Sequence, residues 1–332
     1  MKFLFLGGSG NLSSVVLLDL LQGGHKVDCI TRGNNINLES KAIKQGANFL
    51  HFLDLNHATN FEINALSSSY DIIIDFISYN KDDLASRFYT LSKYASRAYI
   101  FISTTAIYLR SNQVQRVHSE DNFLCLKEWK YAYNKFLAEL WFEETSKKSS
   151  LKTLTIRLGH TIGSSIPVYL GNPGHAFLEH LLSSKPIPCI GKADHPWSVG
   201  TASGLSQLFK QLPYVIDNLP NHLTIHYSGL VTTWLDIMKT LCISLNINAK
   251  FKYLPVSMVN KITPEWLPSI IYHKMYPDLY DLSRLKKYFL IPQYESLDKI
   301  LMSTINITLS SPKELNYQKN LEKMKALDEI LL

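Results

Sequence analysis

The chain has few cysteines, no long apolar run and no concentration of charge, and each absence excludes a class of protein. Its four cysteines, Cys29, Cys125, Cys189 and Cys242, lie far apart and form no C-x-x-C pair. Neither a zinc site nor a disulfide framework is therefore expected, and a reducing cytoplasm fits. No apolar run reaches the roughly 18 residues that cross a bilayer. The N-terminus has one lysine before its first apolar run and is not typical of a signal peptide, so no membrane association is expected.

Metal and nucleic-acid motifs are also missing. The eleven histidines include no H-E-x-x-H motif, and we expect no metal site. The net charge is +6, but Lys and Arg are spread along the chain, which suits an anionic small molecule and argues against nucleic acid as a partner. With 332 residues, 46% of them hydrophobic, the chain can form one large core or one large and one small domain.

The first informative feature is a glycine-rich turn near the N-terminus. A short apolar run at residues 3–6 breaks into Gly7, Gly8 and Gly10, and an amphipathic stretch follows at residues 15–21. That order predicts a strand, a tight turn and a helix. Such a turn lets the backbone approach a pyrophosphate, whose charge then lies on the amides of the helix N-terminus. The sequence therefore favours a dinucleotide site over a plain structural turn.

The first half of the chain alternates between strand and helix patterns, which predicts an α/β Rossmann-type fold with a doubly wound parallel sheet. Strands are expected over residues 25–31, 47–53, 70–76, 98–103 and 151–157, and helices over 36–46, 81–95 and 130–147. We assign residues 1–164 to this domain. Residues 165–310 are expected to hold a smaller substrate-binding lobe and some strands that return to the sheet. Residues 311–332 are expected to form an amphipathic surface helix.

A second signal lies in the predicted helix over 130–147. Tyr131 and Lys135 are four residues apart, so both side chains lie on one helix face. A nearby ammonium lowers the pKa of a phenol, and this would prepare Tyr131 for proton transfer near neutral pH. The Y-x-x-x-K pattern is common by chance, and its place behind a glycine-rich turn is what makes it informative.

Several segments stand in the order and with the residues of one known family. They are Gly7–Ser13, Arg32–Gly33, Asp75–Asn80, Phe101–Thr104, Arg157–Gly163, Thr233–Trp234 and Tyr280–Lys286. Together they resemble the NAD-dependent epimerase/dehydratase family of the extended short-chain dehydrogenase/reductase superfamily, over roughly residues 1–310.

The resemblance implies a set of site residues. Thr104, Tyr131 and Lys135 would form the catalytic trio, with Ser103 or Thr105 as substitutes for Thr104. Lys135 would also bind the nicotinamide ribose. The residues implied for the cofactor are Gly7, Gly10, Asn11, Leu12, Arg32, Asp54, Leu55, Phe76, Tyr131 and Lys135.

Departures from the family pattern limit the substrate. The sugar-nucleotide 4,6-dehydratases have Asp-Glu after their threonine, whereas Thr105 and Ala106 follow Thr104 here, which argues against that reaction. His160 stands where UDP-galactose-type epimerases have Asn, and the segment from His195 to Trp197 lacks their arginine, so a UDP-sugar is in doubt. His160, His195 and Trp197 are our candidate substrate-binding residues, Trp197 by stacking on a sugar ring.

The end of the second strand decides between NAD and NADP. An NAD-specific site usually has an acidic residue there for the ribose 2′-hydroxyl. Here Asp28 comes too early, and Arg32 suits a 2′-phosphate, so NADP is slightly favoured over NAD. Arg32 stacked on the adenine would fit either cofactor.

We therefore expect an NAD(P)-dependent epimerase or oxidoreductase that acts on a sugar-like alcohol or ketone, nucleotide-linked or free. The alternative is a non-catalytic nucleotide-sensing or RNA-binding protein on the same fold. In this superfamily the helix with the tyrosine commonly packs in a dimer interface, and the apolar spacing of residues 136–142 is compatible with a homodimer.

Overall fold

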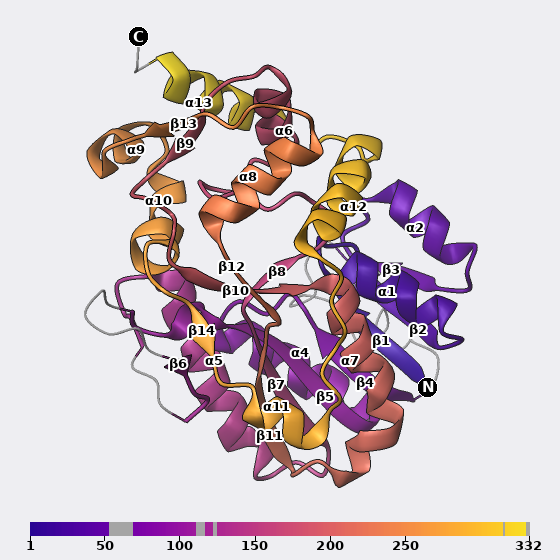
Figure 1. The fold of residues 1–332 in the computed structure, drawn as a ribbon. Helices are drawn as coiled ribbons and strands as arrows, with labels where there is room; N and C mark the ends of the chain where they lie inside the picture. The colour runs from indigo at the N-terminus through magenta and orange to yellow at the C-terminus, as the bar shows by residue number, and fades with distance from the viewer. Residues whose placement is uncertain (53–68, 111–116, 122–124, 315, 330–332) are drawn as a thin grey trace.

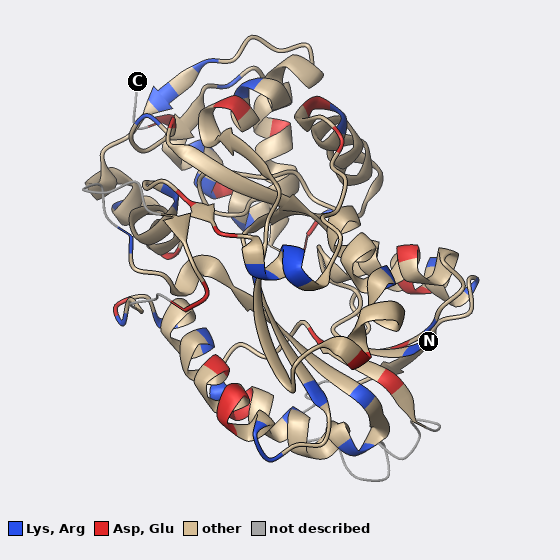
Figure 2. Cartoon of the chain, turned by 60° about the horizontal axis from the view of Figure 1, so that its bottom comes forward, with Lys and Arg blue, Asp and Glu red and all other residues tan. Residues whose placement is uncertain are grey.

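The protein forms two lobes, one built on a central sheet and one of helices and short strands, at the top of Figure 1. The computed structural model describes residues 1–52, 69–110, 117–121, 125–314 and 316–329. Within these ranges no helix is long and apolar enough to cross a bilayer. Lys and Arg are spread over both lobes and interspersed with Asp and Glu (Figure 2).

The central sheet has seven parallel strands, which confirms the expected Rossmann-type architecture. In spatial order they are β11 (His222–Tyr227), β7 (Lys152–Leu158), β5 (Ala95–Thr104), β4 (Tyr70–Asp75), β1 (Lys2–Leu6), β2 (Lys26–Thr31) and β3 (Asn48–His51). The strand order reverses between β1 and β4. In open parallel sheets ligands bind beyond the carboxyl ends of the strands at such a switch point.

Alternate residues of the central strands pack on opposite faces of the sheet. Phe3 and Phe5 of β1 join a core with α1 (Ser13–Gln22) and α7 (Ala202–Val215). Leu4 and Leu6 join a core with α4 (Lys81–Leu91) and α5 (Lys130–Ser146) on the other face. Both faces are covered, which explains why these strands read as continuous apolar runs. Two shorter helices, α2 (Ile36–Ile43) and α11 (Ser283–Tyr288), complete this lobe.

The second lobe has its own core, built around Trp197 and Trp234. Its helices are α6 (Gly174–Leu182), α8 (Trp234–Ser244), α9 (Val256–Ile262), α10 (Leu267–Ser269), α12 (Leu297–Ser310) and α13 (Tyr317–Glu329). Its strands form the small sheets β12 (Leu230–Thr233), β10 (Pro196–Thr201) and β8 (His160–Ile162), and β13 (Phe251–Tyr253) with β9 (Ile187–Cys189). Since α7 and β11 lie in the first lobe, the chain returns to the main sheet after residue 201.

The C-terminal helix α13 is amphipathic, with one face packed on the second lobe and its other residues exposed or partly buried. Tyr317, Met324 and Leu327 of α13 are buried in the core of the second lobe. The helix is short of apolar residues because only one narrow face is needed for this contact. It is an integral part of the lobe.

A buried ion pair attaches α5 to the sheet. Glu139 accepts hydrogen bonds from Arg157 of β7, at 2.9 Å from its Nε, and it pairs with the Ser103 hydroxyl of β5. The side chains of Glu139 and Arg157 are 6% and 4% exposed, so each depends on the other for compensation of its charge. Glu139 is one helical turn from Lys135, and this contact therefore fixes how α5 presents its N-terminal half.

Replacing Glu139 by Ala should destabilise the protein by roughly 3–5 kcal/mol, because the Arg157 guanidinium loses its carboxylate while it stays buried. Urea unfolding measures the loss. The control is Glu144→Ala on the same helix, where the pair with Lys147 is exposed and its loss should not change the midpoint detectably. Equal stability of the Glu139 and Glu144 variants would contradict the anchoring role.

Candidate active site

A cleft of about 810 Å³ opens where the central strands end, between the two lobes. It brings together most of the site residues that the sequence predicts. Those that line it are Gly7, Gly10, Asn11, Leu12, Phe76, Thr104, Tyr131, Lys135 and His160.

The glycine-rich turn forms one end of the cleft. Gly7 has a φ of +88°, and a Cβ on it would lie 2.2 Å from Cγ2 of Ile77, so a side chain is excluded there. The Gly10 amide donates to the Ser13 hydroxyl at 3.0 Å, and that hydroxyl donates to the Gly7 carbonyl at 2.5 Å. Helix α1 then starts without an acidic residue in its first turn and without a side-chain cap. Its free amides and its dipole fit the pyrophosphate of a dinucleotide.

The loop after β4 is shaped by the buried carboxylate of Asp75. It accepts hydrogen bonds from the amides of Ile77 and Ser78, at 2.9 and 2.8 Å, and from the Ser78 hydroxyl at 2.5 Å. This turn places Phe76 in the wall of the cleft. It also presents the Ser78 carbonyl to the side chain of Lys135.

Lys135 is held by backbone carbonyl oxygens. Its ammonium donates to Ser78 at 2.6 Å and to Ile102 at 2.7 Å, and it lies 4.7 Å from the centre of the Phe101 ring. Its side chain is buried, and burial lowers the pKa of its ammonium to about 8. The carbonyls fix the direction of the side chain, and one N–H remains for a ligand in the cleft.

Tyr131 corrects one of our expectations. We expected the Lys135 ammonium to lower the pKa of this phenol, but desolvation in the cleft raises the pKa to about 12, and Thr104 is the neighbour that favours the phenolate. The physical reason is that Lys135 is engaged by carbonyl oxygens, and among the described contacts none joins it to the Tyr131 hydroxyl. Thr104 is therefore the neighbour that favours the Tyr131 phenolate, whereas the Lys135 ammonium is directed to the two carbonyls.

Other candidates are only partly brought to the cleft. His160 lines it, with its ring against Trp234 at 4.6 Å, and its buried Nε2 has no partner among the described residues. Trp197 is fully buried in the second lobe, so our expectation that a sugar ring stacks on it is wrong. His195 is half-buried just before β10 and does not line the cleft.

The remaining cofactor candidates lie elsewhere. Arg32 is exposed at the carboxyl end of β2 and is not part of the cleft wall. Asp28 is in the middle of β2 and accepts a hydrogen bond from Tyr70 at 2.8 Å, which agrees with our placing it too early for a ribose contact. Asp54 and Leu55 lie outside the described residues.

Several residues of the cleft escaped the sequence reasoning. Trp129, Trp266, His273, Lys274 and Asn320 line it from the start of α5 and from the second lobe. Only Trp129 carried a signal, since it lies two residues before Tyr131. The others belong to segments that long-range packing brings to the site.

Comparison with known proteins identifies the family. The model of the NAD dependent epimerase/dehydratase family matches residues 3–197. The chain belongs to this family. It is accordingly an NAD-dependent enzyme of the extended short-chain dehydrogenase/reductase type, as the resemblance implied. No curated protein matches the sequence.

Solved structures share the fold at low sequence identity. UDP-glucuronic acid 4-epimerase from Bacillus cereus, in complex with UDP-glucuronic acid and NAD, is 15% identical with a TM-score of 0.71, over 93% of this chain and 99% of that one. dTDP-glucose 4,6-dehydratase from Bacillus anthracis, in complex with NAD, is 16% identical with a TM-score of 0.73, over 98% and 99%. UDP-glucose 4-epimerase from Bifidobacterium longum, in complex with NAD+ and UDP, is 14% identical with a TM-score of 0.71, over 94% and 99%.

The lowered pKa of Lys135 makes stability depend on pH. Above pH 8 the folded chain loses the proton of Lys135 while the unfolded chain still holds it. The free energy of unfolding should therefore rise by about 3 kcal/mol as the pH increases from 8 to the ordinary pKa of a lysine side chain. Urea unfolding of wild type and Lys135→Met between pH 7 and pH 10 isolates the effect, because only the variant lacks the rise. Lys130→Met, at an exposed position of the same helix, should follow wild type. A Lys135→Met profile parallel to wild type would refute the assignment.

Proposed function

We propose that the protein is an NAD(P)-dependent epimerase or oxidoreductase that acts on a sugar-like alcohol or ketone through Thr104, Tyr131 and Lys135. The observation that carries the proposal is the cleft itself, which brings the glycine-rich turn together with Thr104, Tyr131 and Lys135. The bound nicotinamide supplies the chemistry of hydride transfer. The UDP-glucuronic acid in the complex of one structural neighbour and the UDP in that of another suggest the class of substrate.

Tyr131 moves the proton in this reaction. With its pKa raised to about 12, the phenol is protonated at neutral pH and can donate to a ketone oxygen as the carbonyl is reduced. The Thr104 hydroxyl then stabilises the phenolate that remains, and it can bind the same substrate oxygen. In the oxidative direction the proton of the alcohol returns to Tyr131. An epimerase would turn the ketone over between the two steps.

Lys135 has a positioning role beside this pair. Its ammonium is aimed by the Ser78 and Ile102 carbonyls, and its third N–H suits a ribose hydroxyl of the cofactor. Its charge would also favour the phenolate once the cleft is closed to water by its ligands.

Replacing Tyr131 by Phe should lower turnover by about 10²–10⁴-fold, because it removes the acid–base group and keeps the ring. Purified protein with NAD is assayed with UDP-glucose and UDP-glucuronic acid, for absorbance of the reduced nicotinamide and for epimeric products. Tyr133→Phe, on the same helix and half-buried, should remain active. A Tyr131→Phe variant with full turnover would remove the mechanism.

We further propose that Arg32 gives the site a preference for NADP. The side chain is exposed at the end of β2, where the ribose 2′-position lies in this fold, and its guanidinium suits a phosphate in bidentate geometry. Glu39 has the carboxylate that could repel a phosphate. It accepts a hydrogen bond from the Thr31 hydroxyl and pairs with Nε2 of His51, each at 2.8 Å.

Replacing Arg32 by Ala should weaken NADP binding about tenfold or more while it leaves NAD binding nearly unchanged, because only NADP has the 2′-phosphate. Fluorescence titration of wild type and variant with both dinucleotides measures the two dissociation constants. Equal losses for both would indicate stacking on the adenine instead.

We also propose that two copies of the chain pair through α4 and α5. Tyr89 on α4 is 67% exposed and Leu140 on α5 is 44% exposed, so these helices present apolar side chains to solvent.

A further inference from the structure

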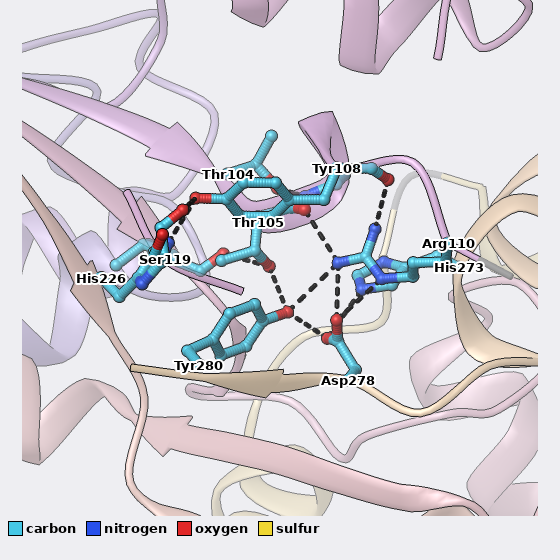
Figure 3. Close-up of polar contacts among 11 residues, drawn as sticks. Thr104, Thr105, Tyr108, Arg110, Ser119, His226, His273, Asp278 and Tyr280 are labelled. Carbon is cyan, nitrogen blue, oxygen red and sulfur yellow. Dashed lines mark hydrogen bonds and ion pairs between the residues drawn. The ribbon is translucent and has the colours of Figure 1, made fainter. Parts of the chain in front are cut away.

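A buried polar network joins the two lobes beside the cleft (Figure 3). Arg110, which follows β5, donates to Oδ1 of Asp278 from Nε at 2.8 Å and from a terminal nitrogen at 2.6 Å. Tyr280 donates to the other carboxylate oxygen, and its hydroxyl lies 2.7 Å from that of Thr105. The side chains of Arg110 and Asp278 are 1% and 0% exposed, so the charge of Asp278 is already compensated within the fold.

His273 is the member of this network that reaches the cleft. One ring nitrogen, Nε2, lies 2.8 Å from Oδ2 of Asp278, and the residue also lines the cavity. Arg110 and His273 hold the pKa of the Asp278 carboxyl well below its usual range against the effect of burial, so this carboxylate is ionised and can only accept. His273 must therefore carry its proton on Nε2 and donate it to Asp278.

The second ring nitrogen of His273 remains a free acceptor. Burial lowers the pKa of the imidazole to about 4, helped by the charge of Arg110, so the ring is neutral at pH 7 and Nδ1 bears a lone pair. Among the described residues Nδ1 has no hydrogen-bond partner, and it does not belong to the polar atoms sealed from solvent. The side chain is 11% exposed, and the residue lines the cavity.

Its surroundings suit a sugar ring. The Trp129 ring lies 5.6 Å from that of Tyr131 and 6.2 Å from that of His273, so His273 and the phenol are separated by a single indole. His160, a second neutral imidazole in the wall, leaves its buried Nε2 without a partner among the described residues, which costs free energy unless a ligand meets it. His273 also lies in a π-helical turn, Ile270–Lys274, a rare geometry that is frequent at functional sites.

We propose that His273 binds the substrate by accepting at Nδ1 a hydrogen bond from a hydroxyl group of a neutral sugar ring. Asp278 and Arg110 hold the His273 imidazole in the orientation that this contact requires. The contact holds one end of the sugar at the second lobe, beside the Trp129 indole, and thereby selects which of its carbons meets the Tyr131 phenol. This assignment rests on the proposed function, since it takes the cleft to be the substrate site.

Two substitutions separate this role from a structural one. His273→Gln keeps a donor where Nε2 lies and so keeps the contact with Asp278, but it has no acceptor where Nδ1 lies. His273→Asn keeps a group at the Nδ1 position and loses the donor to Asp278. With the NAD-loaded full chain and UDP-glucose as the probe, His273→Gln should weaken probe binding about tenfold at unchanged stability. His273→Asn should lower stability towards urea and bind the probe more tightly than His273→Gln does. A purely structural histidine gives the opposite order and overturns the proposal.

Nitrogen-15 spectra of the histidine side chains supply a readout that needs no turnover. His273 should appear as the neutral Nε2–H form near pH 7, and UDP-glucose should move its Nδ1 signal. A protonated Nδ1, or an Nδ1 signal that UDP-glucose leaves unmoved, overturns the assignment. The proposed function fails separately, if wild type binds neither NAD nor NADP or if Tyr131→Phe retains turnover.

Discussion

The arrangement of the cleft depends on the buried ion pair between Arg110 and Asp278. Transfer of both charges from water costs several kcal/mol each, and their attraction offsets this only when the remaining donors and acceptors are satisfied. They are satisfied here by groups from both lobes: Arg110 also donates to the carbonyls of Thr105 and Tyr108, and Asp278 also accepts from His273 and Tyr280. Because the set is complete only in one relative position of the lobes, it aligns the end of β5 with the wall that faces it.

Two lysines of the cleft show a different use of burial. Lys135 and Lys274 are both held by pairs of backbone carbonyls, and in both burial lowers the pKa of the ammonium, to about 8 and about 7. Neither is paired with a carboxylate in these contacts, so neither position is explained by ion-pair stability. Carbonyl dipoles aim an ammonium without neutralising it, which leaves its charge for a ligand. At pH 7 Lys135 is therefore mostly an oriented cation, and Lys274 is partly protonated.

The sequence is most informative where local pattern determines structure. The apolar runs and the turn at Gly7 and Gly10 are sufficient for the sheet and its switch point, and the spacing of Tyr131 and Lys135 places both on the cleft side of α5. The pKa of Tyr131 could not be predicted in this way. Helix spacing brings Lys135 near, but the carbonyls of Ser78, in the loop after β4, and Ile102, in β5, decide where its ammonium points. For the same reason Trp197 looked available for stacking: its burial comes from Trp234 and His273, which lie far along the chain.

The position after Thr104 shows how the interlobe network also restricts the chemistry. In the resemblance drawn from the sequence, dehydratases have their acid and base at the two residues that follow this threonine. Here Thr105 is fully buried, with its carbonyl accepting from Arg110 and its hydroxyl facing Tyr280 and Leu158, and Ala106 presents only a methyl group to the cleft. A carboxylate at residue 105 would lie within the environment of Asp278 and would repel it in a low-dielectric region. Residue 105 belongs to the network between the lobes and therefore cannot also supply an acid for the removal of water. This supports the proposed proton transfer through Tyr131.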